Sequence, residues 1–251
     1  MNDFLNCVMD IGEQMLVCGA EVHRVEDSVE RMCYALGAKR IDVFIITSSM
    51  VVTVCDGADN TFTQTRRIKY TVTDFEKLHK LNELSRKICR EKLNAEQVRE
   101  EILCISQSRT YPSLAVTISY AVIAGAFTMF FGGGLAEAIV SFVIGAVVRL
   151  MILLSEKAIQ NKVFAKFLSS FVATALAFVA VKMNLISGVD KVLIGNIMSL
   201  IPGIGFTNAL RDLFTGDSIA GLLRLIEAML TALSIAAGYF AFVFISGGYS
   251  L

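Results

Sequence analysis

The sequence predicts an α-helical membrane protein in which five transmembrane helices follow a small α+β cytoplasmic domain. The chain is 55% hydrophobic, which is high for a soluble domain of 251 residues. Charge is uneven, because residues 1–112 hold 15 of the 23 Lys and Arg and 17 of the 23 Asp and Glu. The remainder contains apolar runs near the roughly 20 residues that a helix needs to cross the hydrocarbon core. We therefore predict a cytoplasmic domain over residues 1–110 and a transmembrane domain over residues 111–251.

The first domain should contain helices at both ends and strands between them. Apolar residues at three- and four-residue spacing predict a helix that ends near Gly19 and a second helix from about 21 to 36. The β-branched runs RIDVFIITSSMVVTVC and TFTQTRRIK, separated by DGADN, predict antiparallel strands joined by a turn. Thr73 and Glu76 match a capping box for a third helix, and Asn94 should cap a fourth.

The six cysteines all belong to this first domain, and none forms a CxxC pair. That spacing argues against a zinc ribbon or a thioredoxin-like motif, and scattered reduced thiols suit the cytosol. The start, MNDFLNCVMDIGEQ, carries acids where a secretory signal would carry bases, so no cleaved signal peptide is expected.

The second domain should consist of five spans, at about 113–131, 135–154, 163–182, 189–205 and 219–246. Lys and Arg cluster where the second span meets the third, so the positive-inside rule places the N-terminus in the cytoplasm and the C-terminus outside. Thiols at Cys18 and Cys89 should then be cytoplasmic, and a cysteine placed at Ser250 should be external.

The fourth span is interrupted, because the apolar run VLIGNIMSLI stops at Pro202 and is followed by the polar stretch FTNALRDLFTGD. Inside a bilayer, irregular backbone is tolerated only where protein or water satisfies it, and broken helices often form transport sites. The alternative is that Pro202 ends a short span and an ordinary inner loop follows. If the break lies at membrane depth, the predicted substrate path comprises Pro202, Gly203, Thr207, Asn208, Arg211, Asp212 and Asp217.

The stretch CGAEVHRVED, residues 18–27, concentrates charge on the second helix. Val22, Val25 and Val29 should face the core, which sends the charged side chains to the other sides. His23 and Asp27 lie four residues apart, so a metal site is conceivable, but a solvated or subunit-contact face is the more common arrangement. We predict a His23 to Asp27 contact without bound metal, within a gating or assembly set of Glu21, His23, Arg24, Glu26, Asp27, Arg66 and Arg67.

Several of these runs resemble one known family. The runs CGAEVHRVEDSVERMCYALG, FIITSSMVV, TRRI and LNELSR resemble the cytoplasmic N-terminal part of the ThrE-type threonine/serine exporter family. The run IPGIGFTNALRDLFTGDSIAGLLRLIEAML is similar to that family's Pro-Gly break followed by TNA, RDL and GD. The matches keep the expected order over about residues 10–235. The resemblance implies export of small polar metabolites, which are threonine and serine in the fused long members.

The chain departs from the long form, which has about twice as many spans. It resembles instead the YjjP-like larger subunit of a split exporter, whose partner is a second short membrane protein. Such split members are also associated with dicarboxylates such as succinate. Five helices are few to enclose a polar path, so a second subunit or self-association is expected. The sequence has no GxxxxGK[ST] loop, which favours ion or proton coupling over ATP hydrolysis.

We therefore expect a multi-pass exporter subunit of the cell membrane for small carboxylate-bearing metabolites. Its partners should be membrane lipid, a small-molecule substrate and another membrane subunit, with no nucleic acid, cofactor or metal. One rival is a membrane-tethered enzyme with a hydrolytic or metal site at Glu21, His23, Glu26 and Asp27. A second rival is an assembly or sensor protein. A single span would anchor an enzyme, so five spans with a broken fourth helix favour transport.

Overall fold

The computed structural model describes residues 2–57, 60–108, 111–159 and 161–247, with the side chains of 156–159 excepted. The chain forms two compact units. Residues 1–109 and 205–225 make one, here the N-terminal unit, and residues 110–204 and 226–251 make the other, here the membrane unit. Residues 205–225 thus belong with the first unit although they lie between membrane segments in sequence.

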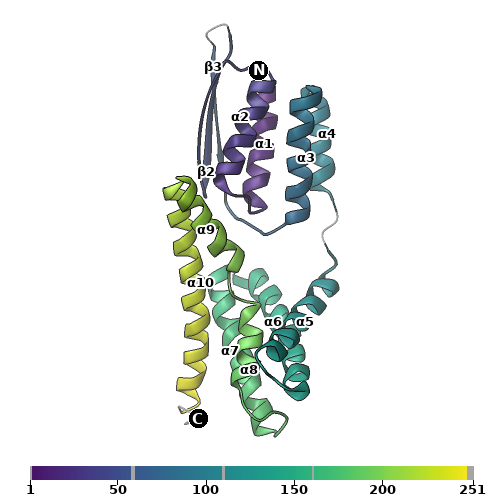
Figure 1. The fold of residues 1–251 in the computed structure, drawn as a ribbon, viewed down its shortest axis with the longest axis vertical. Helices are drawn as coiled ribbons and strands as arrows, with labels where there is room; N and C mark the ends of the chain where they lie inside the picture. The colour runs from purple at the N-terminus through teal and green to yellow at the C-terminus, as the bar shows by residue number, and fades with distance from the viewer. Residues whose placement is uncertain (1, 58–59, 109–110, 160, 248–251) are drawn as a thin grey trace. The chain divides into compact units, whose positions relative to one another are not determined.

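The N-terminal unit has three layers (Figure 1). The antiparallel sheet, in the order β1-β2-β3, lies on one side of α1 and α2, and α3 and α4 lie on the other side. Its core is built from the apolar faces of these elements, with α1, α2 and β2 contributing most of the fully buried side chains. The elements are α1 (Asn2–Val17), α2 (Val22–Ala35), β1 (Arg40–Ile46), β2 (Ser49–Cys55), β3 (Thr61–Arg67), α3 (Phe75–Glu91) and α4 (Ala95–Ser106).

Two local predictions for this unit need correction and one is confirmed. The run from residue 40 to 55 is two strands, because Thr47 and Ser48 form a turn that reverses the chain. That turn has neither Gly nor Pro, and the weaker turn preference of Ser48 does not stand out within a β-branched run. The cap of α3 is Asp74, whose side chain accepts a hydrogen bond from the Lys77 amide at 3.0 Å. Asn94 caps α4 as predicted, within a complete capping box.

Two of the positions expected to report topology are unsuitable as thiol probes. Ser250 lies outside the described residues. Cys18 is only 4% exposed, and burial raises the pKa of its thiol to about 11. Because the thiolate is the reactive form, a native thiol on the surface is the better probe. Cys104 is exposed and serves that purpose.

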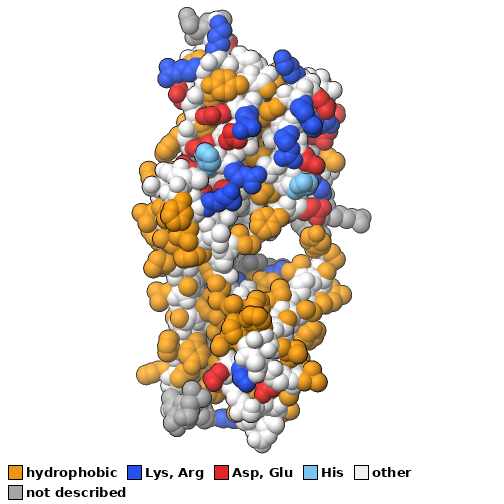
Figure 2. Space-filling view, in the orientation of Figure 1, with side chains coloured by type: hydrophobic (Ala, Val, Ile, Leu, Met, Phe, Trp, Pro, Cys, Tyr) orange, Lys and Arg blue, Asp and Glu red, His pale blue; other side chains and the backbone are white. Residues whose placement is uncertain are grey.

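The helices after residue 112 are those of a membrane protein. Among the described residues, α5 (Ser113–Phe130), α6 (Leu135–Ile159), α7 (Lys162–Lys182) and α10 (Ser218–Ile245) are long and apolar enough to cross a bilayer. A fifth span results if α8 (Asp190–Met198) and α9 (Gly203–Thr215) count as one bent span. Figure 2 shows charged side chains over α1–α4 and hydrophobic side chains over the helices of the membrane unit. The prediction of a helical membrane protein is confirmed.

Small and hydroxyl-bearing residues hold the membrane unit together. A Cβ at Gly195 would lie 2.7 Å from the Ala124 carbonyl oxygen, so α5 and α8 approach too closely for any larger residue. Beside this contact, Thr128 Oγ1 lies 2.6 Å from Ser141 Oγ, which also accepts from Asn196 Nδ2 at 3.2 Å. Such polar contacts between closely packed helices replace the hydrophobic effect, which gives no net attraction between helices in lipid.

Candidate functional site

The charged stretch at the start of α2 contacts the polar segment that follows the broken span. Asn208 Nδ2 donates to the Gly19 carbonyl oxygen at 3.2 Å, and Arg211 Nη1 lies 3.0 Å from Glu21 Oε1. These residues all belong to the N-terminal unit. We define the α2–α9 contact as residues 19–26 packed against residues 208–224. It joins residues that the sequence assigns to two separate sets, one for the substrate path and one for gating or assembly.

A tight helical hairpin presents this polar segment. Gly216, with φ of +103°, occupies the left-handed region that ends α9, and the Asp217 amide donates to the Asp212 carbonyl oxygen at 2.9 Å. Further along, a Cβ at Gly221 would lie 2.7 Å from Leu213 Cγ and 2.9 Å from the Ala209 carbonyl oxygen. The hairpin therefore needs glycine at both positions, at one for its conformation and at the other for its small size.

A buried ion pair joins the two helices of the hairpin, and its arginine also bonds to the turn between α1 and α2. Asp212 and Arg224 expose only 1% and 12% of their side chains, and Arg224 Nη1 lies 3.1 Å from Asp212 Oδ2. Arg224 Nη2 also donates to the Ala20 carbonyl oxygen at 2.6 Å. One guanidinium thus links α10, α9 and the α1–α2 turn. Arg224 is not among the residues that the sequence predicts for the site, although a charge within an apolar helix is itself a signal of function.

A small cavity of about 150 Å³ adjoins the contact. Its lining combines apolar side chains with an acid, a base and two amides, a set that suits a small zwitterion. An ammonium group can pair with a carboxylate there, and a carboxylate with a guanidinium. The lining residues are Met15, Gly19, Ala20, Glu21, Arg24, Val25, Phe75, Leu78, Asn82 and Asn208.

A second cluster lies at the other end of the contact. It consists of three side chains whose possible ligand atoms all lie within 4.8 Å of one another, namely those of His23, Glu26 and Asp217. The Ile45 amide donates to Glu26 Oε1 at 3.1 Å. Burial, with the neighbouring Asp217 carboxylate as the second cause, raises the pKa of Glu26 to about 7. This cluster can hold a proton or a cation.

The predicted contact between His23 and Asp27 is not formed. Asp27 Oδ1 instead accepts from Arg31 Nε at 2.8 Å, and both side chains are exposed. Arg31 is also four residues from Asp27, and its permanent charge makes it the stronger partner. His23 is left with Glu26 and Asp217 as its acidic neighbours.

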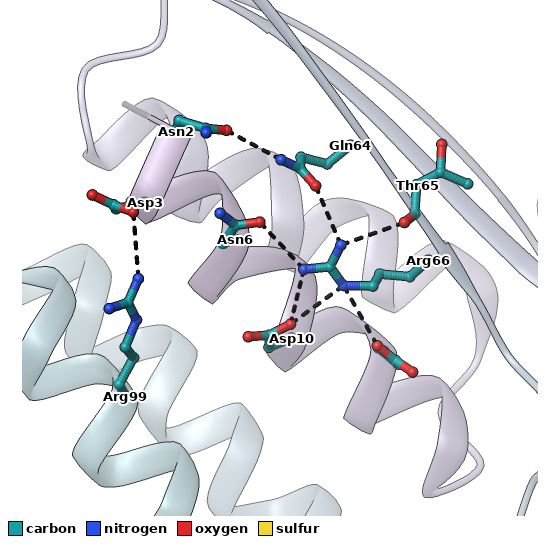
Figure 3. A network of polar contacts seen from close by, with 9 residues as sticks. Asn2, Asp3, Asn6, Asp10, Gln64, Thr65, Arg66 and Arg99 are labelled. Atoms are coloured by element: carbon teal, nitrogen blue, oxygen red, sulfur yellow. Dashed lines mark hydrogen bonds and ion pairs between the residues drawn. The ribbon is translucent and has the colours of Figure 1, made fainter.

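Arg66 and Arg67 lie outside the α2–α9 contact. Figure 3 shows Arg66 reaching from β3 to α1, where its Nη2 donates to Asp10 Oδ1 at 3.1 Å and to Asn6 Oδ1 at 3.3 Å. A third α1 side chain, Glu13, lies 3.6 Å from Arg66 Nε. Arg66 therefore ties the sheet to α1 within one unit. Arg67 is exposed at the end of β3.

The remaining residues of the predicted path lie just before the polar segment or at its beginning. Pro202 lies in the break between α8 and α9, and Gly203 is the first residue of α9. Both belong to the membrane unit. Thr207 lies one turn into α9 and is exposed. Of the seven predicted path residues, Asn208, Arg211, Asp212 and Asp217 are those that the structure brings to the α2–α9 contact.

Comparison with known proteins gives one result that covers nearly the whole chain. The model of the family described as "Putative threonine/serine exporter" matches residues 6–245. No curated protein and no solved structure shows a significant similarity.

Proposed function

The chain belongs to the threonine/serine exporter family, and from this premise we propose that it exports small carboxylate-bearing metabolites by a path that includes the α2–α9 contact. Family membership makes it a membrane transporter with several apolar helices and not an enzyme. The alternative of a membrane-tethered enzyme with a site at Glu21, His23, Glu26 and Asp27 is thereby overturned. We further propose that it resides in the cell membrane with a cytoplasmic N-terminus.

The observation that carries the proposal is the ion pair between Glu21 and Arg211. Arg211 is 60% exposed while Glu21 is 15% exposed, and Glu21 also lines the cavity. A substrate carboxylate can compete with Glu21 for Arg211, because the arginine side of the pair is open to solvent and a partly exposed ion pair is weaker than a buried one. The freed Glu21 can then bind the substrate ammonium group. Substrate binding would thus break the ion pair between α2 and α9, and this broken contact would act as a gate.

The same charges favour an amino acid over a dicarboxylate. Threonine or serine offers one carboxylate for Arg211 and one ammonium group for Glu21. A dicarboxylate such as succinate would place its second carboxylate near Glu21, where like charges repel. Arg24, also in the cavity lining, provides a second base, so a dicarboxylate remains the second candidate.

We propose two further features of the transport cycle. The described residues contain four to five helices able to span a membrane, which are few for enclosing a polar path, so a second short membrane subunit or another copy of this chain should complete it. Transport should be coupled to an ion or a proton, since the sequence has no phosphate-binding GxxxxGK[ST] loop.

The test is efflux of labelled threonine, serine and succinate from cells expressing this chain with its partner subunit. Removing one charged contact should lower efflux roughly 10- to 100-fold in Arg211→Ala, and less in Asn208→Ala, whose amide is neutral. Arg31→Ala is the matched control, because Arg31 also pairs with an acid on α2 but lies outside the contact. If Arg211→Ala and Asn208→Ala both export normally at normal membrane abundance, the substrate path lies elsewhere.

A further inference from the structure

The cluster of His23, Glu26 and Asp217 has the composition of a metal site. His23 and Glu26 are three residues apart and share one face of α2, and Asp217 approaches them from the turn between α9 and α10. In place of the metal-free contact expected from the sequence, we propose that these three side chains bind one divalent transition-metal ion, such as Mn²⁺ or Zn²⁺. The ion would clamp the start of α10 to α2 and so stabilise the α2–α9 contact. This site is separate from the pairing of Arg211 and Glu21.

The donor set suits such an ion. One imidazole nitrogen and two carboxylate oxygens are ligands for Zn²⁺, and for Mn²⁺ among the harder metals. Three protein ligands leave coordination positions for water. His23 is exposed, so an ion can reach the cluster from solvent.

Charge and hydrogen bonding provide a second line of support. Among the residues that the structure describes, no ion pair includes Glu26 or Asp217. Asp217 Oδ2 is buried without a hydrogen-bond partner. A buried carboxylate oxygen without a partner is costly, and two adjacent carboxylates repel each other. A bound cation removes both costs at once.

Neighbouring groups already orient the proposed ligands. The Ile45 amide holds Glu26 Oε1 at 3.1 Å, which leaves the other carboxylate oxygen for an ion. The Asp217 backbone is fixed by the hydrogen bond from its amide to the Asp212 carbonyl oxygen. Such outer contacts position metal ligands and contribute to affinity.

The proposal is tested by calorimetric titration of the purified, chelator-treated full-length protein with MnCl₂. Mn²⁺ is the better first probe, because the cysteine thiols would compete for Zn²⁺ but bind Mn²⁺ poorly. One Mn²⁺ per chain is expected. His23→Ala and Asp217→Asn should each weaken binding by about tenfold or more. Asp217→Asn keeps the size of the side chain, so its effect does not depend on a change in packing.

The control is His79→Ala. His79, the second of the two histidines in the chain, lies 3.5 Å from Glu83 on α3, so it forms an exposed histidine and carboxylate pair outside the cluster. Mn²⁺ binding should be unchanged in this variant. Failure of the unaltered protein to bind Mn²⁺ would overturn the proposal, and so would equal losses in His23→Ala and His79→Ala. Either result leaves the dependence of export on Arg211 untouched, so the two proposals fail separately.

Discussion

Replacing Arg224 by methionine removes one partner of the most buried ion pair of the N-terminal unit. Methionine keeps much of the length and apolar contact of the arginine side chain, so the main change is the loss of charge. Asp212, with 1% of its side chain exposed, then has no counter-ion, and the Ala20 carbonyl oxygen loses its donor at 2.6 Å. Both losses occur where the hairpin of α9 and α10 meets the α1–α2 turn.

The expected cost follows from this burial. Removing one member of a buried pair typically destabilises a protein by about 3–5 kcal/mol, because the remaining charge is left uncompensated. For a chain of this size each kcal/mol lowers the melting temperature by about 2–4 °C, so Arg224→Met should lower it by about 6–20 °C. The double variant with Asp212→Asn should recover much of this loss, since no unpaired buried charge remains.

The assay is thermal unfolding of the purified protein in detergent, followed by circular dichroism because the chain has no tryptophan. Arg31→Met is the matched control, since Arg31 and Asp27 pair at 2.8 Å but expose 72% and 47% of their side chains. An exposed pair contributes about 0–1 kcal/mol, so the control should shift the melting temperature by less than about 4 °C. Equal shifts for the two arginine variants, or no recovery in the double variant, would show that the buried ion pair does not stabilise the protein.

Four further predictions test the hairpin, a helix cap, the burial of a thiol and the topology. Gly221→Leu should cost about 1–3 kcal/mol in the same unfolding assay, because a side chain there overlaps α9; an unchanged melting temperature would argue against the close helix contact. Asn94→Ala should cost about 1 kcal/mol through loss of the capping box, whereas Asn94→Ser should cost less. In native protein at neutral pH, maleimide should react with Cys104 and leave Cys33 unmodified. Burial raises the pKa of the Cys33 thiol to about 12, so its reactive thiolate forms only as the pH approaches that value. On whole cells, an impermeant maleimide should label a Ser246→Cys variant but not Cys104, and the opposite pattern would invert the proposed orientation.

Local sequence signals predict most of the individual elements of this protein. Apolar runs near 20 residues identify the spanning helices, because the bilayer thickness sets their length. The cap at Asn94 and the core face of α2 follow from patterns within a few residues. The strand turn at Thr47 and Ser48 is missed because its residues also favour strands or their ends.

The candidate site illustrates the limit of such signals. The sequence marks residues 18–27 and the polar stretch after Pro202 as unusual, each for its own composition. Nothing in either stretch says that they contact each other. A pattern of spacing reports only on neighbours within one helix or strand.

The sequence alone therefore predicts the class of protein and the positions of its spanning helices, and it singles out the charged stretches that form the candidate site. The contacts between these stretches follow only from the way the chain folds. Glu21 pairs with Arg211, which is 190 residues away in the chain. Arg224 pairs with Asp212, and Asp27 pairs with Arg31 and not with His23. Pairing between distant segments depends on how whole elements pack, and packing is set by the shapes of many side chains at once rather than by any short run of residues.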